Sequence, residues 1–418
     1  MREVNRGEIK RMEIGWIDFS REDRKKALTI LQTLQEEGAV DELGIGVIRD
    51  AFANYFFPGT STLHTRAKYL LIVPYIVHDA LAHRKGKSAE RVIIDIDRRE
   101  RACAERMLAN GGKDDRIIGR NALRNGEWVK RPPSDIYWNG IRTYEIFRTG
   151  EYPDMSLDDF IRFSCKRMDD PVRFMGKDRT AGDNDYDDAD AHVARVFPFF
   201  DIEDLYEDGW DEDPHIELTK KEAAYLRRKI LTSPRVSNTL MGYVLAHNIA
   251  LEEYEDFGAL YEDIRGKLPA AVEEMMKLAS DFNYLVFAAR VRYNWILTGG
   301  EGEEAVRLWR YCADNIDKIA LVDVDRIRTL EIMLRCKEDV FAFLQKLKNA
   351  FLSRKFELVD ELIKNQEVEI KGEDRAKLRH PEKVAEGSWV GGYRLDYRMS
   401  DAGAILKDII NVMGGDRC

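Results

Sequence analysis

The stretch DELGIGVIRDAFANYFFPGTSTLHTRAKYLLIVPYIVHD, residues 41–79, decides the fold class of this chain. Apolar residues recur at helical spacing on both sides of a Pro-Gly pair at 58–59 and the hydroxyl cluster Thr60–Thr62. This pattern predicts a helix over residues 41–57. It also predicts a second helix after the cluster, whose hydroxyls offer N-caps and which Pro74 should kink.

Helical signals continue through most of the chain. Residues 88–110 read as a charged, exposed helix, although RVIIDID near its start also suits a short strand, and Ser134 stands where it would cap another helix. Further helices are predicted by capping boxes and amphipathic runs at Ser156–Asp159, Thr219–Glu222, 268–297, 301–319 and 324–351. Strand-like alternation is limited to 367–370 and 393–397. We therefore expect a mainly α, multi-helical fold with a small β element near the C-terminus.

Charge divides the chain into three predicted parts. Residues 151–217 hold 21 Asp and Glu against 7 Lys and Arg, a local balance of −14, whereas the whole chain carries −10. The remainder is therefore mildly basic. We expect an N-terminal helical domain over 1–150, an acidic, loop-rich connecting segment over 151–218, and a C-terminal helical domain with short strands over 219–418.

Composition points to a cytoplasmic protein. The chain has 418 residues, of which 44% are hydrophobic, enough for a substantial core. Its five cysteines are widely spaced and form no Cys-x-x-Cys pair, as is typical of reduced thiols. The longest apolar run, Tyr69–Val77, is far below the roughly 20 residues of a membrane helix. We expect no contact with a membrane, and a net negative charge excludes a surface built throughout for nucleic acid.

The basic and aromatic stretch 113–148 is the strongest candidate for a binding surface. Arginine can hold phosphates while planar rings stack on unpaired bases, so the mixture suits DNA or RNA. The alternative is that its aromatic residues are core and its charges form a solvated face or pair with the acidic segment. The candidate nucleic-acid-binding residues here are Arg116, Arg120, Arg124, Trp128, Lys130, Arg131 and Arg142.

A second candidate is an anion site after the hydroxyl cluster. His64, Arg66 and Lys68 follow Thr60–Thr62 at the expected start of a helix. Backbone amides at a helix N-terminus, together with hydroxyls and basic side chains, can hold a phosphate or carboxylate. Ordinary helix capping explains the hydroxyls equally well.

Metal chemistry has two weaker signals. Asp183, Asp185 and Asp187 alternate like the first ligands of a calcium loop, but Asp188 replaces the required glycine and Ala194 the twelfth ligand. A looser divalent site and a solvated acidic loop both stay open.

The second signal is a nuclease-like tripeptide. Glu369-Ile370-Lys371 has the Glu-x-Lys core of metal-dependent nucleases, in which a carboxylate holds magnesium on a strand. Asp95 or Asp97 could supply a further carboxylate. Magnesium is expected only under this alternative, and such a tripeptide is common by chance in a chain that is 34% charged.

Three phrases suggest a family. TST at 60–62 with TRAKYLLIVPYI at 65–76, PSDIYWNGI at 133–141 and RLDYR at 394–398 resemble a bacterial family known only as domain of unknown function 6361. The likeness extends from about Ile14 to Ile410. The resemblance implies the neighbourhood of helicase-like and phospholipase-D-like nuclease genes, and hence antiviral defence, but it carries over no catalytic residue. Basic positions within the phrases are Arg66, Lys68, Arg394 and Arg398.

The function that we expect is an accessory component that binds DNA or RNA and partner proteins. Those partners would include helicase-like or phospholipase-D-like nuclease subunits of a defence or DNA-processing assembly. A metal-dependent nuclease is the first alternative. The second is a purely structural interaction subunit whose acidic loop docks a basic partner through residues 183–190.

Overall fold

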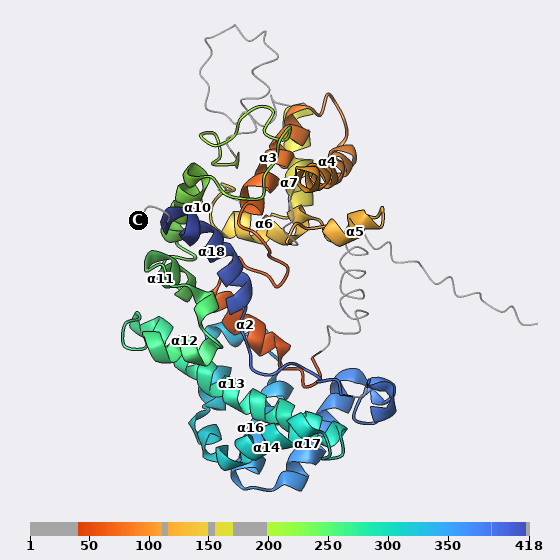
Figure 1. Cartoon of the computed structure of the whole chain (residues 1–418), viewed down its shortest axis with the longest axis vertical. Coiled ribbons are helices and arrows are strands. Elements are labelled where there is room, and N and C mark those ends of the chain that lie inside the picture. Colours follow the sequence, from red (N-terminus) through yellow and green to blue (C-terminus); the bar gives the residue numbers. More distant parts are fainter. Residues whose placement is uncertain (1–40, 111–115, 149–154, 170–198, 386, 415–418) are drawn as a thin grey trace, which may run out of the picture.

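The structure, a computed structural model, describes residues 41–110, 116–148, 155–169, 199–385 and 387–414 (Figure 1). Every regular element within these ranges is a helix, and the one strand-type pairing is an isolated antiparallel bridge between Phe147 and Phe200. The mainly α fold is confirmed. The predicted C-terminal β element is wrong.

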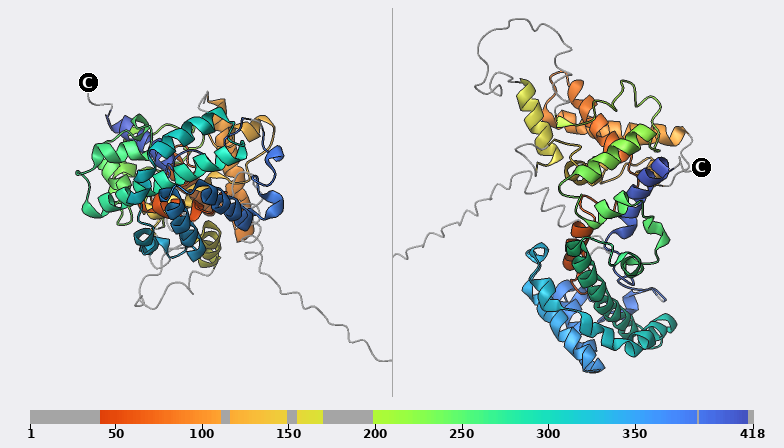
Figure 2. Two further views of the ribbon diagram at one scale, coloured as in Figure 1. Left: turned by 90° about the horizontal axis from the view of Figure 1, so that it is seen from below. Right: turned by 90° about the vertical axis from the view of Figure 1, so that its left-hand side faces the viewer.

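Helices α3 to α7, all from the first half of the chain, gather toward one end of an elongated molecule (Figures 1 and 2). The buried helix α3 packs against α4 and α6, and α4 also packs against α5 and α7. Their bounds are Tyr69–Ala82 for α3, Ala89–Ala109 for α4, Arg120–Arg124 for α5, Pro133–Thr143 for α6 and Leu157–Asp169 for α7.

The opposite end is built around one long helix, α13, which spans Ala270–Leu297. Around it lie helices from the second half of the chain and one from the first, α2, whose Phe52 ring centroid is 6.2 Å from that of Phe282. The remaining bounds are Gly46–Phe56 for α2, Phe257–Ile264 for α12, Glu303–Asp314 for α14, Val324–Arg328 for α15, Glu338–Leu352 for α16 and Phe356–Lys371 for α17.

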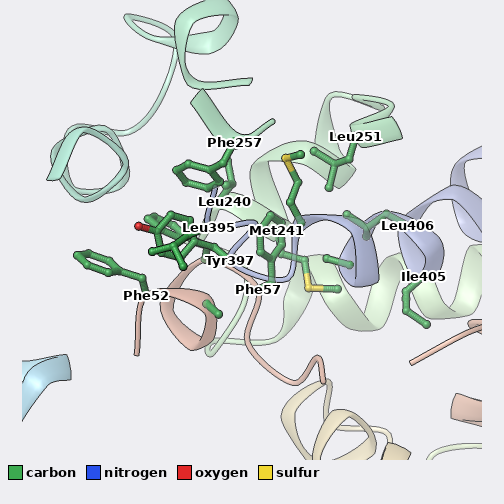
Figure 3. Packing of buried hydrophobic residues seen from close by; sticks show 14 of the residues in the cluster. Phe52, Phe57, Leu240, Met241, Leu251, Phe257, Leu395, Tyr397, Ile405 and Leu406 are labelled. Carbon is green, nitrogen blue, oxygen red and sulfur yellow. The ribbon is translucent and has the colours of Figure 1, made fainter. Parts of the chain in front are cut away.

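Three helices lie between these two ends: α10, Lys220–Thr232; α11, Leu240–Ala246; and α18, Met399–Gly414. The C-terminal helix α18 packs on both α10 and α11. Figure 3 shows how aromatic and aliphatic side chains from distant parts of the sequence meet here, with Phe52, Phe257 and Tyr397 close together. The ring of Tyr397 is 5.7 Å from Phe52 and 4.8 Å from Phe257, centroid to centroid. The core therefore joins both halves of the chain.

Several local predictions hold. The box at Thr219 is complete, because its side chain accepts from the amide of Glu222 while that glutamate accepts from the amide of Thr219. Ser156 caps the start of α7, because its hydroxyl oxygen accepts from the amide of Asp159. The helix predicted over residues 88–110 is α4, which spans Ala89–Ala109, so the strand alternative near its start is wrong. Pro74 lies inside α3 as predicted.

Other local predictions are wrong for identifiable reasons. The hydroxyl cluster does not cap α3, which begins only at Tyr69; Thr60 instead donates to the carbonyl of Phe57 in a turn. Ser134 lies inside the first turn of α6 rather than at its cap. The amphipathic run 324–351 is broken into α15, a short 3-10 turn and α16, since periodicity does not mark where a chain reverses direction.

The predicted strands became other structures. Residues 367–370 form the last turns of α17, where Glu367 is buried and bonded to the hydroxyl of Tyr293 and to the amides of Lys377 and Leu378. Residues 393–397 have no partner strand. Asn283 of α13 holds this part of the chain instead, since it exchanges two hydrogen bonds with the backbone of Leu395, and Asn294 of α13 does the same with Val390 just before it.

Candidate nucleic-acid interface

Helix α5 and the loop after it pack onto α4, and together they form one exposed basic surface. We call it the α4–α5 surface. Arg101 of α4 reaches the carbonyl of Gly126 at 3.5 Å, and Trp128 donates from Nε1 to Asp97 of α4 at 3.0 Å. The cations on these parts of α4, α5 and the loop, which we assign to the surface, are Arg98, Arg101, Arg124, Lys130 and Arg131.

Trp128 is the residue that positions the loop. Its ring covers Gly119, where an added Cβ would lie 2.4 Å from the ring, and the φ of +88° at this glycine is one that side-chain-bearing residues rarely adopt. The indole is half-buried and its N–H is already used by Asp97. Trp128 therefore fixes the shape of the surface, and it contributes less free ring than the sequence suggested.

The cations of this surface are available to different degrees. Arg124, Lys130 and Arg131 are exposed and make no ion pair or hydrogen bond with any residue that the structure describes. Arg98 is 73% exposed although it bonds Asp95 at 2.5 Å, and Arg101 pairs with Glu105 at 3.0 Å. The first three are the strongest candidates for contact with an anion.

The same face also carries other chemistry. Ile94 is 67% exposed and lies one helical turn before Arg98. Exposed acids are interleaved with the cations at Asp97, Glu105 and Glu127. Arg116 and Arg120, two further predicted residues, are half-buried at the edge of the surface and engaged in contacts of their own. The surface is thus mixed, with its unpaired positive charge confined to α5 and the loop.

The predicted anion site is filled by the protein's own carboxylates. Arg66 bonds Asp408 of α18 through Nε at 2.8 Å, and Lys68 bonds Glu222 of α10 at 2.6 Å. His64 is buried, and burial lowers its pKa to about 4, so the ring is neutral near pH 7. Arg66 and Lys68 thus join the start of α3 to α18 and α10 and leave no free cationic pocket.

The other predicted cations are dispersed. Arg142 is half-buried and donates to the carbonyl of Met155. Arg394 pairs with Asp256 at the far end of the molecule. Arg398 donates to the side chain of Asn54 and to the carbonyl of Thr60. None of the three adds to the α4–α5 surface.

The residues of the nuclease alternative do not form a metal centre. Glu369 and Lys371 are two positions apart on α17, so their side chains leave the helix in different directions, and Lys371 pairs with Glu42 at 2.8 Å. Asp95 is bonded to Arg98 and Arg99. No group of three potential metal ligands occurs among the described residues. Asp183, Asp185 and Asp187 lie outside those residues.

Sequence reasoning missed how closely the three quoted phrases meet. The hydroxyl of Tyr137 accepts from the amides of Thr65 and Arg66 at 2.8 and 3.0 Å, and the ring stacks on His64 at 4.2 Å between centroids. Arg398 joins them through the carbonyl of Thr60. The signal available beforehand was the phrases themselves, although their sequence separation concealed the contact. Their meeting point is buried and structural.

Fold and surface together define the class of this molecule: a mainly α-helical protein with an exposed basic face and no metal-ligand cluster in its described part. Residues 12–168 match the model of a family of unknown function (DUF6361). This is the family that the phrases suggested, and the match includes α2 to α7 up to residue 168. The RLDYR phrase at 394–398 lies outside the matched residues.

Comparisons with curated proteins and with solved structures found no match. Within the described ranges, no helix is both long enough and apolar enough to cross a membrane.

Proposed function

We propose that this protein is an accessory component that binds nucleic acid through the α4–α5 surface and acts together with partner proteins. The observation that supports this proposal is the group Arg124, Lys130 and Arg131, which is exposed, close together in the chain and not neutralised by any described acid. An antiviral or DNA-processing assembly is its proposed setting, which the family resemblance alone suggests.

The physical argument concerns the cost of binding. A cation that already has a carboxylate partner must lose that partner before it can gain a phosphate, whereas an unpaired exposed cation gains the phosphate directly and releases counterions from the nucleic acid. Arg66 and Lys68 are of the first kind. Arg124 and its two neighbours are of the second kind, so the binding energy should be concentrated there.

The test is a triple charge reversal, Arg124→Glu, Lys130→Glu and Arg131→Glu. Fluorescence anisotropy with single-stranded and duplex DNA and RNA, over a series of salt concentrations, should show a loss of affinity of more than tenfold. If three phosphate contacts disappear, the slope of log affinity against log salt should fall by about two to three. Circular dichroism should show unchanged helix content, because all three side chains are exposed.

A matched control carries the same change in net charge at the opposite end of the molecule: Arg335→Glu, Lys337→Glu and Lys346→Glu. These cations are also exposed and have no ion pair among the described residues. The control should bind like the unmodified protein. Equal losses in both triple variants would mean that only net charge matters, and retained binding in the first would disprove the proposed surface.

A further inference from the structure

A cavity of about 360 Å³ lies where the start of α12, the middle of α13 and the segment before α18 meet. This volume is within the range of small-molecule sites. The cavity is separate from the α4–α5 surface, which lies toward the other end of the molecule (Figure 1). Neither the family match nor the proposed function assigns it a role.

The floor of the cavity is apolar and rigid. Phe257, Phe287 and Leu395 line it and are buried. Phe257 is fixed from behind, since its ring lies 5.0 Å from that of Phe56. The backbone of Leu395 is held by Asn283 at 2.6 and 2.9 Å. A ligand would therefore meet a preformed apolar surface rather than one that must be ordered on binding.

The single cation in the lining is already neutralised. Nε of Arg394 lies 3.3 Å from Asp256, and its guanidinium lies 4.7 Å above the ring of Phe287. Asp256 is in turn fixed, because it caps α12 by accepting from the amide of Ala259 at 2.8 Å. Arg394 and Asp256 thus neutralise each other within the lining, and Arg394 is poorly placed to attract an anionic ligand.

Two carboxylates in the lining have no ion pair with any residue in the described part of the chain. Glu255 is exposed and pairs with no described residue. Asp396 accepts only from the amide and hydroxyl of Ser400, at 3.2 and 2.6 Å. A cavity that holds two uncompensated negative charges beside an apolar floor will favour positively charged ligands.

An exposed aromatic ring also belongs to the lining. Tyr393 is 48% exposed and stacks on Trp389, with ring centroids 4.7 Å apart and planes 9° from parallel. The pair is held in place because Trp389 donates to the carbonyl of Gly392 and Arg290 donates to the carbonyl of Tyr393. An ordered, electron-rich ring next to carboxylates is the combination that recognises organic cations.

We propose that this cavity binds a small organic cation, namely a primary amine or a guanidinium on a short methylene chain. The carboxylates of Glu255 and Asp396 pair with the charge, Tyr393 contacts it through its ring, and the apolar floor takes the methylene groups. The same chemistry is offered by a free polyamine and by the arginine or lysine side chain of a peptide, and the two sources can be separated by experiment.

The full chain should be titrated calorimetrically with agmatine, with the peptide acetyl-Gly-Arg-Gly-amide and with glutarate as a doubly negative probe. We expect saturable one-to-one binding of at least one cationic probe and none of glutarate. Tighter binding of agmatine would assign a free amine, and tighter binding of the peptide would assign a partner's side chain. Absence of binding by both cations, or binding of glutarate, would overturn the proposal.

The residues are tested by Glu255→Gln and Asp396→Asn, singly and together. Each keeps the size of the side chain, and Asn can still accept from Ser400. The double variant should bind the cation at least tenfold more weakly. Glu253→Gln is the matched control, because Glu253 is exposed nearby but does not line the cavity. Unchanged affinity in a Glu255→Gln variant with native thermal unfolding would contradict the assignment to this cavity.

Discussion

Arg66 shows how burial changes what a basic side chain can do. Its side chain and that of Asp408 are only 7% and 8% exposed, and Asp408 also accepts from the amide of Ala67 at 2.9 Å. Such a pair has left water and is held by several hydrogen bonds. Arg124 and Lys130 have the same charge but remain in solvent. The role of a cation in this chain is therefore set by its partner rather than by its type.

Replacing Arg66 by Met should destabilise the protein by about 3–5 kcal/mol, because Asp408 would be left buried without its cation. Urea unfolding followed by circular dichroism measures the change. Combining Arg66→Met with Asp408→Leu should recover part of the loss. Arg265→Met, at an ion pair with Glu262 in which both side chains are exposed, should cost at most about 1 kcal/mol. A similarly small loss for Arg66→Met would show that the ion pair is not important for the fold.

At the scale of the element, the backbone amides at the start of a helix find their hydrogen-bond acceptors in two different ways. The start of α10 is closed locally by Thr219 and Glu222, within four residues. The start of α6 is closed by Glu100 of α4, to which Ser134 donates from its amide at 2.6 Å and from its hydroxyl at 3.1 Å. The first device can be read from sequence, and the second cannot, since Glu100 is 34 residues away.

Glu100 should make stability depend on pH. Burial, followed by the nearby charges of Asp135 and Asp97, raises its pKa from 4.5 to about 8, against the lowering effect of its bonds to Ser134. Between these values the unfolded chain loses the proton while the folded chain keeps it. The unfolded state then binds fewer protons, so the free energy of unfolding falls as pH rises from 4.5 to about 8.

The variant Glu100→Gln, which does not titrate, isolates this contribution. Its free energy of unfolding relative to the unmodified protein should increase with pH over that window and level off above about 8. The comparison is needed because His64, with its pKa lowered to about 4, acts in the opposite direction and removes stability as pH falls from 6.5 toward 4. A difference between the two proteins that does not vary with pH would contradict the raised pKa of Glu100.

At the scale of the whole molecule, segments near the start and near the end of the described chain pack against each other. Helix α2 lies against α13, and Tyr397, just before α18, contacts Phe52 and Phe257 (Figure 3). Lys68 crosses from the start of α3 to Glu222 of α10. These contacts run across the predicted boundaries of the three-part division at 150 and 218, which itself stays a prediction. A core of this kind should respond to damage as one unit.

We expect a fragment of residues 1–150 to lack a cooperative thermal transition. It would expose Phe52, Phe56 and Phe57 of the α2 region, which are fully buried in the complete chain. Calorimetry measures the transition, and adding the fragment 151–418 should restore it if the two parts can reassemble. A sharp transition in the isolated fragment would show instead that the first part is an independent domain.

Much of this protein was determined by the sequence alone. Apolar periodicity predicted a mainly α fold, because an amphipathic face repeats within a single helix. It located α4 and α13, and it located α14 within the predicted run 301–319. The Thr219 cap followed from residues three apart. Arg124, Lys130 and Arg131 of the α4–α5 surface were also named in advance, whereas Arg98 and Arg101 were not, and the use of this surface by a nucleic acid stays a prediction.

Tertiary structure alone decided the rest. Residues 367–370 are helical in the folded chain, where the buried Glu367 bonds the hydroxyl of Tyr293 and the backbone amides of Lys377 and Leu378. In the folded chain, Arg66 and Lys68 form ion pairs with residues more than a hundred positions away in the sequence. Periodicity reports only neighbours along the chain. Which charges are buried, and which remain free to bind a ligand, depends on partners that only folding brings into contact.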